Sequence, residues 1–363
     1  MLGKDAPTSE IVYVGLMHDS RPGPYPRVRS QEDEHYFDAE GRRADVVPRR
    51  RRWGRALLIL LLVLVLLAVG GYFYLDSRLK RENALDYPGR LSDTPGTNWL
   101  VVGSDSREGL SRQQRRDYAT GRAAGRRTDS MMLLHTGAGG TTLVSLPRDS
   151  YVPIPGHGSN KLNAAFAFGG PTLLVRTVEQ ASGVRIDHYA EIGFGGFVGM
   201  VDAIGGVDMC LKEPMRDPKA GLNLKAGCQE LNGGQALGYV RTRASARADL
   251  DRVKRQRQFF GALIGKASGP GVLLNPFRSI PLAVDGTGNF LVDDGDHLLD
   301  LGSLLWAMRG VSGGDGTTTT VPIGGVGSSA AAGSYITWDR TRALQLFGAL
   351  KEDRPVPKSA ISN

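Results

Sequence analysis

Residues 56–75 form an uninterrupted apolar run, ALLILLLVLVLLAVGGYFYL, that contains no charged residue. A helix of this length spans about 30 Å, which is the thickness of the hydrocarbon layer of a membrane. The preceding residues 42–55 carry seven Arg and one Asp, and a basic block of this kind stays on the cytoplasmic side. A cleaved signal peptide does not fit, because the polar region before the run is far too long. The sequence therefore predicts a single-pass signal anchor in the cell membrane, with a cytoplasmic N-terminus.

This anchor sets the organisation of the whole chain. We expect a disordered cytoplasmic tail at 1–55, which is polar and lacks a sustained period, and the transmembrane helix at 56–75. Outside the cell we expect a stalk at 76–95, one folded extracytoplasmic domain at 96–350 and a C-terminal tail at 351–363. The functional residues should therefore lie in the extracytoplasmic domain.

Within this domain, β-rich apolar segments alternate with segments of helical periodicity. We expect strands at 98–103, 130–134, 141–146, 188–192, 207–211 and 317–323. We expect helices at 161–168, 171–182, 194–204, 235–239, 251–266, 296–309 and 338–350. A Gly-rich turn between the second and third strands predicts an antiparallel hairpin. The alternation and the hairpin together predict an α/β domain with a central mixed β-sheet flanked by helices.

Arginine and aspartate residues recur together near the ends of the predicted strands. They are Asp105 and Arg107, Arg127 and Asp129, Arg148 and Asp149, Arg241 and Arg243, and Asp249 and Arg252. Two like charges about 4 Å apart repel by about 4 kcal/mol at an effective dielectric of 20, so converging guanidinium groups need a strong anion between them. Arginine matches phosphate oxygens in a bidentate fork, and the interleaved carboxylates suit a hard cation such as Mg²⁺. The pattern therefore predicts a pyrophosphate site.

The predicted hairpin brings several of these residues together. Its pairing places Asp129 opposite Pro147, next to Arg148. If 98–103 ran in parallel beside the second strand of the hairpin, Asp105 would join them. Ligands of open α/β sheets bind outside the strand ends, which agrees with this placement. Farther along, we expect an extended segment at 240–243, in which two arginines would point to the same face.

Two cysteines, Cys210 and Cys228, lie in the part predicted to be extracytoplasmic. An oxidising exterior permits a disulfide between them, and closing a loop of this size would contribute about 3 kcal/mol. The alternative is two free thiols. A metal site is not indicated, because no His or further Cys lies nearby.

Seven segments resemble, in order, the LytR-CpsA-Psr family. They are NWLVVGSDSR, RTDSMMLLH, TTLVSLPRDSYVPIPG, KLNAAFAFGGP, DHYAEIGFGGFVGMVDAIGGVDM, LNGGQALGYVRTR and DLDRVKRQRQFF, and together they cover roughly 98–266. The resemblance implies a membrane-anchored extracytoplasmic phosphotransferase of Gram-positive bacteria. Such an enzyme transfers an anionic glycopolymer from a polyprenyl-pyrophosphate carrier to peptidoglycan during cell wall assembly. The implied partners are this lipid-linked glycan, peptidoglycan and the membrane.

The same resemblance implies roles for individual residues. Asp105 and Asp129 would hold Mg²⁺ or Mn²⁺ against the pyrophosphate, and Arg127, Arg148, Arg241, Arg243 and Arg252 would grip its oxygens. Arg107 would lie at the rim, Asp149 beside the substrate, and Asp249 would orient an arginine or act as base, while Lys161 and Asn163 match a K-x-N motif. One departure is Asp251, because the family often has a glycine there.

A polyprenyl carrier also needs an apolar site, and the family has a hydrophobic tunnel. The candidates are the apolar faces of 164–168 and 171–178, with Phe194, Phe197 and Val198. The same residues would equally make an ordinary core. The neighbouring GFGGFVG run only half resembles a dinucleotide fingerprint, because it lacks the third-glycine spacing and a suitable downstream acid.

Two alternatives to the transferase stay open. One is a hydrolase of polyprenyl pyrophosphates, with water as the acceptor. The other is a non-catalytic membrane-bound regulator or transcriptional attenuator, in which the basic run at 49–52 binds nucleic acid. The cytoplasmic tail has nearly balanced charges and no helix-turn-helix pattern, so we expect no nucleic-acid partner. Teichoic acid-like, arabinogalactan-like and capsular polymers all fit the transferase.

Overall fold

A computed structural model describes residues 50–120, 128–242 and 248–362, and it describes side chains within 53–120, 128–242 and 255–362. The first helix, α1 (Arg50–Ser77), contains the apolar run. Its part from Trp53 to Ser77 is long and apolar enough to cross a membrane, and none of its apolar window is buried. The chain divides into two units within this helix, between Val63 and Leu64. The expectation of one apolar helix before the domain is therefore confirmed.

The domain is built on a mixed sheet of seven strands in the order β1-β12-β7-β2-β3-β4-β13. These strands are β1 (Lys80–Arg81), β2 (Thr97–Ser104), β3 (Thr128–Thr136), β4 (Thr142–Leu146), β7 (His188–Ile192), β12 (Phe290–Val292) and β13 (Thr317–Thr320). β3 pairs antiparallel with both β2 and β4, whereas β2 pairs in parallel with β7. The predicted α/β class with a mixed sheet is confirmed. The parallel pairing of 98–103 with 141–146 is wrong, because β3 lies between these strands.

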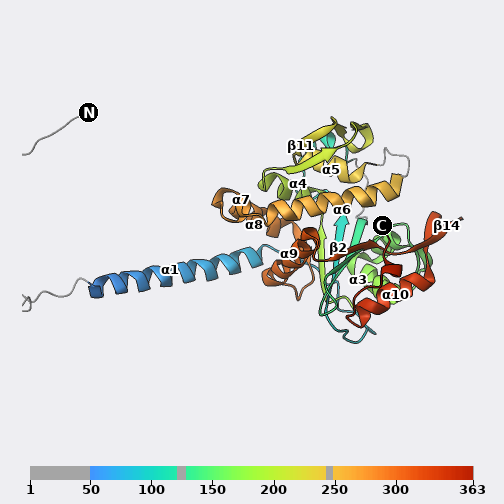
Figure 1. Cartoon of the computed structure of the whole chain (residues 1–363), viewed down its shortest axis with the longest axis horizontal. Coiled ribbons are helices and arrows are strands. Elements are labelled where there is room, and N and C mark those ends of the chain that lie inside the picture. The colour runs from blue at the N-terminus through green and yellow to red at the C-terminus, as the bar shows by residue number, and fades with distance from the viewer. Residues whose placement is uncertain (1–49, 121–127, 243–247, 363) are drawn as a thin grey trace, which may run out of the picture. The chain divides into compact units, whose positions relative to one another are not determined.

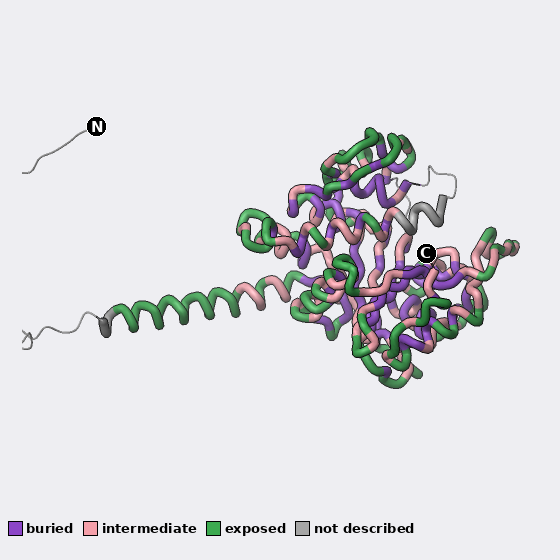
Figure 2. Tube along the Cα trace, in the orientation of Figure 1, coloured by how far each residue is buried: buried purple, intermediate pink, exposed green. Residues whose placement is uncertain are grey.

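Helices cover both faces of this sheet (Figure 1). α3 (Leu162–Ser182) and α10 (Arg340–Lys351) pack on one face, and α6 (Ala248–Ala267) and α9 (Leu298–Gly313) pack on the other. Side chains alternate along each strand, so that Leu100 and Leu133 face α3 while Trp99 and Leu134 face α9. α3 joins the two helices predicted at 161–168 and 171–182 across a kink at two glycines. Figure 2 shows this buried layer in purple.

A second layer with its own core packs beside the sheet. It contains α4 (Phe194–Ala203), α5 (Gly233–Arg241), β8 (Val207–Leu211), β9 (Met215–Asp217), η1 (Pro218–Ala220), β10 (Leu222–Leu224) and β11 (Gly227–Leu231). The strand predicted at 207–211 exists as β8, but it pairs with β11 outside the central sheet. Cys210 and Cys228 lie opposite each other in this pair and form a disulfide.

The remaining elements surround these two layers. They are α2 (Arg112–Asp117), β5 (Tyr151–Ile154), β6 (Gly158–Lys161), α7 (Pro270–Leu273), α8 (Pro276–Asn289), β14 (Ile323–Ser329), β15 (Gly333–Trp338) and η2 (Lys358–Ala360). The predicted stalk, 76–95, belongs to the folded domain, because β1 pairs with β12 and the side chains of Ala84 and Leu85 are buried in the core. The predicted tail also packs on the domain, since Ala360 is buried and the backbone N–H of Ser362 donates to Thr319 Oγ1 at 2.8 Å.

Candidate functional site

Charged residues meet where strands β2 and β4 of the central sheet end and strand β3 begins. We call this row of strand ends the charged edge. Asp105 directly follows β2, Asp129 is the second residue of β3, and Arg148 and Asp149 follow β4. β2 and β4 both run antiparallel to β3, so the ends of these two strands and the start of β3 lie at the same edge. The register pairs Met131 with Leu146. Pro147 was predicted to lie opposite Asp129, and in this register it lies one residue away from that position. Asp105, Asp129, Arg148 and Asp149 therefore lie at the same ends of neighbouring strands, despite the wrong strand neighbour.

Arg148 links two carboxylates at this edge. Its Nη1 lies 2.8 Å from Asp129 Oδ1 and its Nε lies 3.3 Å from Asp149 Oδ2. Lys161, at the end of β6, places Nζ 3.0 Å from Asp149 Oδ1. Burial alone would raise the pKa of Asp149, but the hydrogen bond from Lys161 and the charge of Arg148 outweigh it and lower this pKa. Asp149 is therefore ionised at neutral pH and holds two cations beside Asp129.

The start of α3 fixes the loop that carries Arg148. The backbone N–H of Asn163 donates to the carbonyl of Arg148 at 3.1 Å, and that of Leu162 donates to the carbonyl of Ser150 at 2.8 Å. These bonds use N–H groups that a helix start leaves without intrahelical partners. The K-x-N motif thus lies against the site, where Lys161 supplies a charge and the Asn163 backbone supplies a support.

The loop after β2 adds another ion pair. Arg107 Nη2 lies 3.9 Å from Asp105 Oδ2, and both side chains are mostly buried. Arg107 Nε donates to the carbonyl of Thr120 at 2.8 Å. This bond ties the loop to the end of the α2 segment, so that Asp105 is held at the strand end.

Arg241 reaches the same edge from α5. The sequence predicted an extended segment here, but Asn232 caps the helix together with Gln235, and the helix continues through Arg241. The guanidinium group lies 4.9 Å from the ring centre of Phe194, and Nη1 donates to the carbonyl of Tyr118 at 2.8 Å. Burial lowers the pKa of Arg241, and the negative charge of nearby Asp129 acts in the opposite direction.

Four predicted site residues have side chains outside the described part of the structure: Arg127, Arg243, Asp249 and Arg252. The predicted pairing of Arg241 and Arg243 on one face of an extended segment fails at Arg241, which is helical. Next to the second gap, Thr242 Oγ1 donates to Asp217 Oδ2 at 2.7 Å, and Arg255 Nη2 donates to the carbonyl of Thr242 at 2.7 Å. These bonds hold the described residues on each side of 243–247 beside the charged edge.

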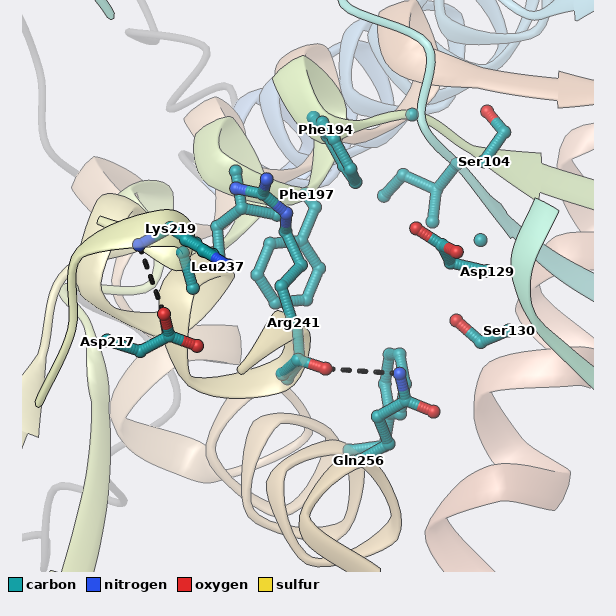
Figure 3. A pocket seen from close by; sticks show the side chains of 16 residues that line it. Ser104, Asp129, Ser130, Phe194, Phe197, Asp217, Lys219, Leu237, Arg241 and Gln256 are labelled. Carbon is teal, nitrogen blue, oxygen red and sulfur yellow. Dashed lines mark hydrogen bonds between the residues drawn. The ribbon is translucent and has the colours of Figure 1, made fainter. Parts of the chain in front are cut away.

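A cavity of about 320 Å³ opens beside the charged edge. Its apolar lining comes from Ile192, Phe194, Phe197, Leu237, Val240 and Phe260, and its polar lining includes Asp129, Ser130, Asp217, Lys219, Arg241 and Gln256. Figure 3 shows Asp129 and Arg241 on opposite sides of this space. The cavity therefore joins a charged rim to an apolar interior.

The predicted apolar site is only partly where the sequence placed it. Phe194 and Phe197 line the cavity. The candidates at 164–168 and 171–178 do not line the cavity. Their buried residues pack with β2 and β3 in the main core, on the other face of the sheet. Val198 is buried in the second core and does not line the cavity.

Among the polar residues of the cavity that sequence reasoning missed are Asp217, Lys219 and Gln256. The first two lie in the chain segment that the disulfide closes into a loop, and Gln256 lies on α6 with Nε2 donating to the carbonyl of Val240 at 3.2 Å. The sequence offered one signal for two of these residues: the segment between the two cysteines is charged, and no binding partner was expected for those charges.

The glycine run after β7 serves close packing. A Cβ on Gly195 would lie 2.0 Å from the carbonyl oxygen of Glu108, and a Cβ on Gly196 would lie 2.6 Å from Asn289 Cβ. α4 can therefore start directly against the loop that follows Asp105. This packing accounts for the half match to a dinucleotide fingerprint.

A second group of ionisable residues lies at the opposite end of β7. His188 Nδ1 is hydrogen-bonded to Asp296 Oδ1, and Asp296 Oδ2 accepts from the backbone N–H of Tyr189 at 3.1 Å. Burial alone would lower the pKa of His188, but the hydrogen bond and negative charge of Asp296 outweigh it and raise this pKa. His188 pairs with Trp99 at the start of β2, whereas Asp105 follows the other end of that strand. This pair is therefore separate from the charged edge.

Comparisons with known proteins show which family this chain resembles. The model of the LytR_cpsA_psr family matches residues 75–287. "Probable cell wall biosynthesis protein LcpB" of Corynebacterium glutamicum is 52% identical over 280 residues, which are 77% of this chain and 66% of that protein. "Cell wall biosynthesis protein LcpA" of the same organism is 30% identical over 298 residues, 72% of this chain and 57% of that protein. The chain thus spans just under two thirds of the length of the first relative and less of the second.

Solved structures share the fold. The "LytR-Csp2A-Psr enzyme from Actinomyces oris" superposes with a TM-score of 0.60 at 24% identity, covering 76% of this chain and 96% of that one. The structure titled "TagT bound to LI-WTA" superposes with a TM-score of 0.55 at 24% identity, covering 76% of this chain and 98% of that one.

Proposed function

Because the chain belongs to the LytR-CpsA-Psr family, we propose that it transfers an anionic glycopolymer from a polyprenyl-pyrophosphate carrier to peptidoglycan. The observation that carries the proposal is the meeting of a charged edge with an apolar cavity, where Asp129 and Arg241 border a space lined by Phe194 and Phe197. A polyprenyl pyrophosphate has the same division, with an anionic head and a hydrocarbon tail. The names of the relatives from Corynebacterium agree with a role in cell wall assembly.

The cations at the edge suit the pyrophosphate head. Arg107, Arg148, Lys161 and Arg241 come from four different segments and are held by carboxylates or backbone carbonyls. Guanidinium groups fixed in this way bind phosphate oxygens without a large loss of side-chain entropy. They also neutralise the charge that grows on the leaving group, which is the main protein contribution to phosphoryl transfer.

The carboxylates at the edge fit a magnesium ion. Mg²⁺ is usually bound through one or two carboxylates together with substrate phosphates, rather than by a complete protein cage. Asp105 and Asp129 provide two carboxylates at adjacent strand ends, beside the proposed phosphate position. Bound there, the ion would supply Lewis-acid stabilisation of the phosphoryl oxygens. Arg148 would keep the Asp129 carboxylate oriented, because its Nη1 already lies 2.8 Å from Oδ1.

The chain also fits the location that this reaction needs. α1 is long and apolar enough to anchor the domain to a membrane, and we propose that it leaves the domain outside the cell. The disulfide between Cys210 and Cys228 agrees with an oxidising exterior.

The test uses the full chain in lipid vesicles with Mg²⁺, a lipid-pyrophosphate oligosaccharide and peptidoglycan oligomers. Mass spectrometry should detect the sugar attached to peptidoglycan with the wild-type protein, and Asp129→Asn should abolish this product. Asp208→Asn is the matched control, because Asp208 is an exposed aspartate paired with Lys266 in the second layer. Equal product from the wild type and Asp129→Asn would refute the site. Free sugar phosphate without attachment would replace the transferase by a hydrolase.

A further inference from the structure

Large apolar side chains are exposed on one part of the domain. Outside α1, the described residues include nine that are at least half exposed: Phe168, Leu273, Leu274, Phe277, Ile280, Leu299, Trp306, Val326 and Leu344. Six of them lie on α7, α8 and α9 or directly after α7. Leu274 is 82% exposed and Phe277 is 88% exposed. We call Leu273, Leu274, Phe277 and Ile280 the α7–α8 face, whose chain is largely green in Figure 2.

The α7–α8 face is tied to the C-terminal end of α1. Arg78 follows that helix, and its Nε donates to the carbonyl of Val284 in α8 at 3.4 Å. Phe277 lies seven residues before Val284, which corresponds to about 10 Å along a helix. The start of α9 is tied to the same place, because the backbone N–H of Leu298 donates to Asp76 Oδ1 at 2.8 Å. The next residue, Leu299, is another exposed apolar side chain.

The end of α1 has the composition of a membrane–water boundary. The charge-free run ends in Tyr72 and Tyr74, and aromatic residues of this kind gather at headgroup level. Arg78 lies over the ring of Tyr74 at 5.8 Å. Amphipathic helices at this level bury their apolar side chains about 5–10 Å into the headgroup and acyl boundary. A face within about 10 Å of this boundary is within reach of the lipid.

From these observations we propose that the α7–α8 face inserts into the outer leaflet of the membrane that α1 crosses. The inference rests on the proposed membrane anchor. Between 270 and 281 the only charged residue is Arg278, which is exposed and suits anionic lipid headgroups. The opposite side of α8 packs on the domain, where Asn289 meets Gly196 of α4.

Insertion would bring the cavity close to its lipid substrate. α4, which α8 contacts, also carries Phe194 and Phe197 of the cavity lining. The domain would then rest on the membrane at two places, α1 and the α7–α8 face, and could not rotate freely about its anchor. α4 would then connect the inserted face to the apolar lining of the cavity.

The test uses the full chain in phosphatidylcholine–phosphatidylglycerol vesicles that contain a phospholipid with a diazirine in its upper acyl chain. After illumination, mass spectrometry of peptides should find lipid attached to α1 and to 270–281. The peptide of α10 that contains Leu344 is the internal control, because Leu344 is equally apolar and exposed but lies on another face of the domain. We expect no attachment there.

A double variant, Leu274→Ser with Phe277→Ser, should reduce attachment to 270–281 by about tenfold or more, because burying each side chain is worth at least that factor. Attachment to α1 should not change, and Leu344→Ser should have no effect. Attachment to α1 alone in the wild type would overturn the inference and leave the anchor standing. Attachment to neither segment would overturn both, and equal attachment to the α10 peptide would show that the face has no preference for lipid.

Discussion

Replacing Arg148 with lysine tests whether the site needs the bidentate contacts of a guanidinium group or only a positive charge. Arg148 contacts Asp129 through Nη1 at 2.8 Å and Asp149 through Nε at 3.3 Å. A lysine has a single terminal nitrogen on a flexible stem, so it keeps the charge but not the bridge between the two carboxylates. It also cannot bind two oxygens of one phosphate in a planar fork.

The expected effect on activity is much larger than the effect on stability. A hydrogen bond between charged groups contributes about 1.5–3 kcal/mol when it is buried. The side chain of Asp129 is 35% exposed, so solvent screening reduces the loss to about 1 kcal/mol. For a domain of this size, that loss lowers the melting temperature by about 2–4 °C. Loss of one aligned donor to a developing anion slows turnover by about 10²–10³-fold.

The assay measures transfer and thermal unfolding of the full chain side by side. Arg354→Lys is the matched control, because Arg354, like Arg148, uses two guanidinium nitrogens in ion pairing. Its Nε and Nη2 both contact the carboxylate of Glu352. That pair is about 60% exposed on both sides and lies at the far end of the β3–β4 hairpin, against Gly139. Turnover within a few-fold of wild type in Arg148→Lys, or an equal loss in Arg354→Lys, would refute the reasoning.

Two further predictions concern stability. Gly195→Ala should lower the free energy of unfolding in urea by about 1–3 kcal/mol, because its Cβ would lie 2.0 Å from the carbonyl oxygen of Glu108; Gly199→Ala, with nothing within 4 Å, should not, and equal effects would contradict the packing. The raised pKa of His188 implies that its pairing with Asp296 contributes stability fully below about pH 6.5 and loses it as pH rises through the folded pKa. Asp296→Asn should therefore destabilise the domain more at pH 6 than at pH 9, and a pH-independent difference in urea unfolding would contradict this.

Long apolar segments made much of the fold predictable. β2, β3, β4 and β7 each form a run of buried side chains that ends in polar or glycine residues, so pattern and turn signals located them. β1 and β12 have two and three residues and are too short to show a period. Their omission explains why 76–95 was expected to be a stalk.

The candidate site was predictable where local pairing determines it. The hairpin alone placed Asp129 near Arg148, and the structure has these side chains in contact. The predicted conformation of Arg241 was wrong, because the helix that starts after Asn232 does not end at Tyr239 but continues through Arg241. Lys219 was missed because it lies in the loop between Cys210 and Cys228, and no local sequence pattern predicts the contact of this loop with the cavity.

The position of the last strands in the sheet has a consequence for how the chain folds during synthesis. β12 lies between β1 and β7, and β13 lies beside β4, although both are made after every other strand of the sheet. About 100 residues separate β7 from β12, and synthesis at about 5–20 residues per second takes about 5–20 s over that length. Through this interval β7 and β4 have unpaired backbone groups that can pair with another chain. We therefore expect the growing domain to need protection from pairing with other chains until residues near 320 have been made.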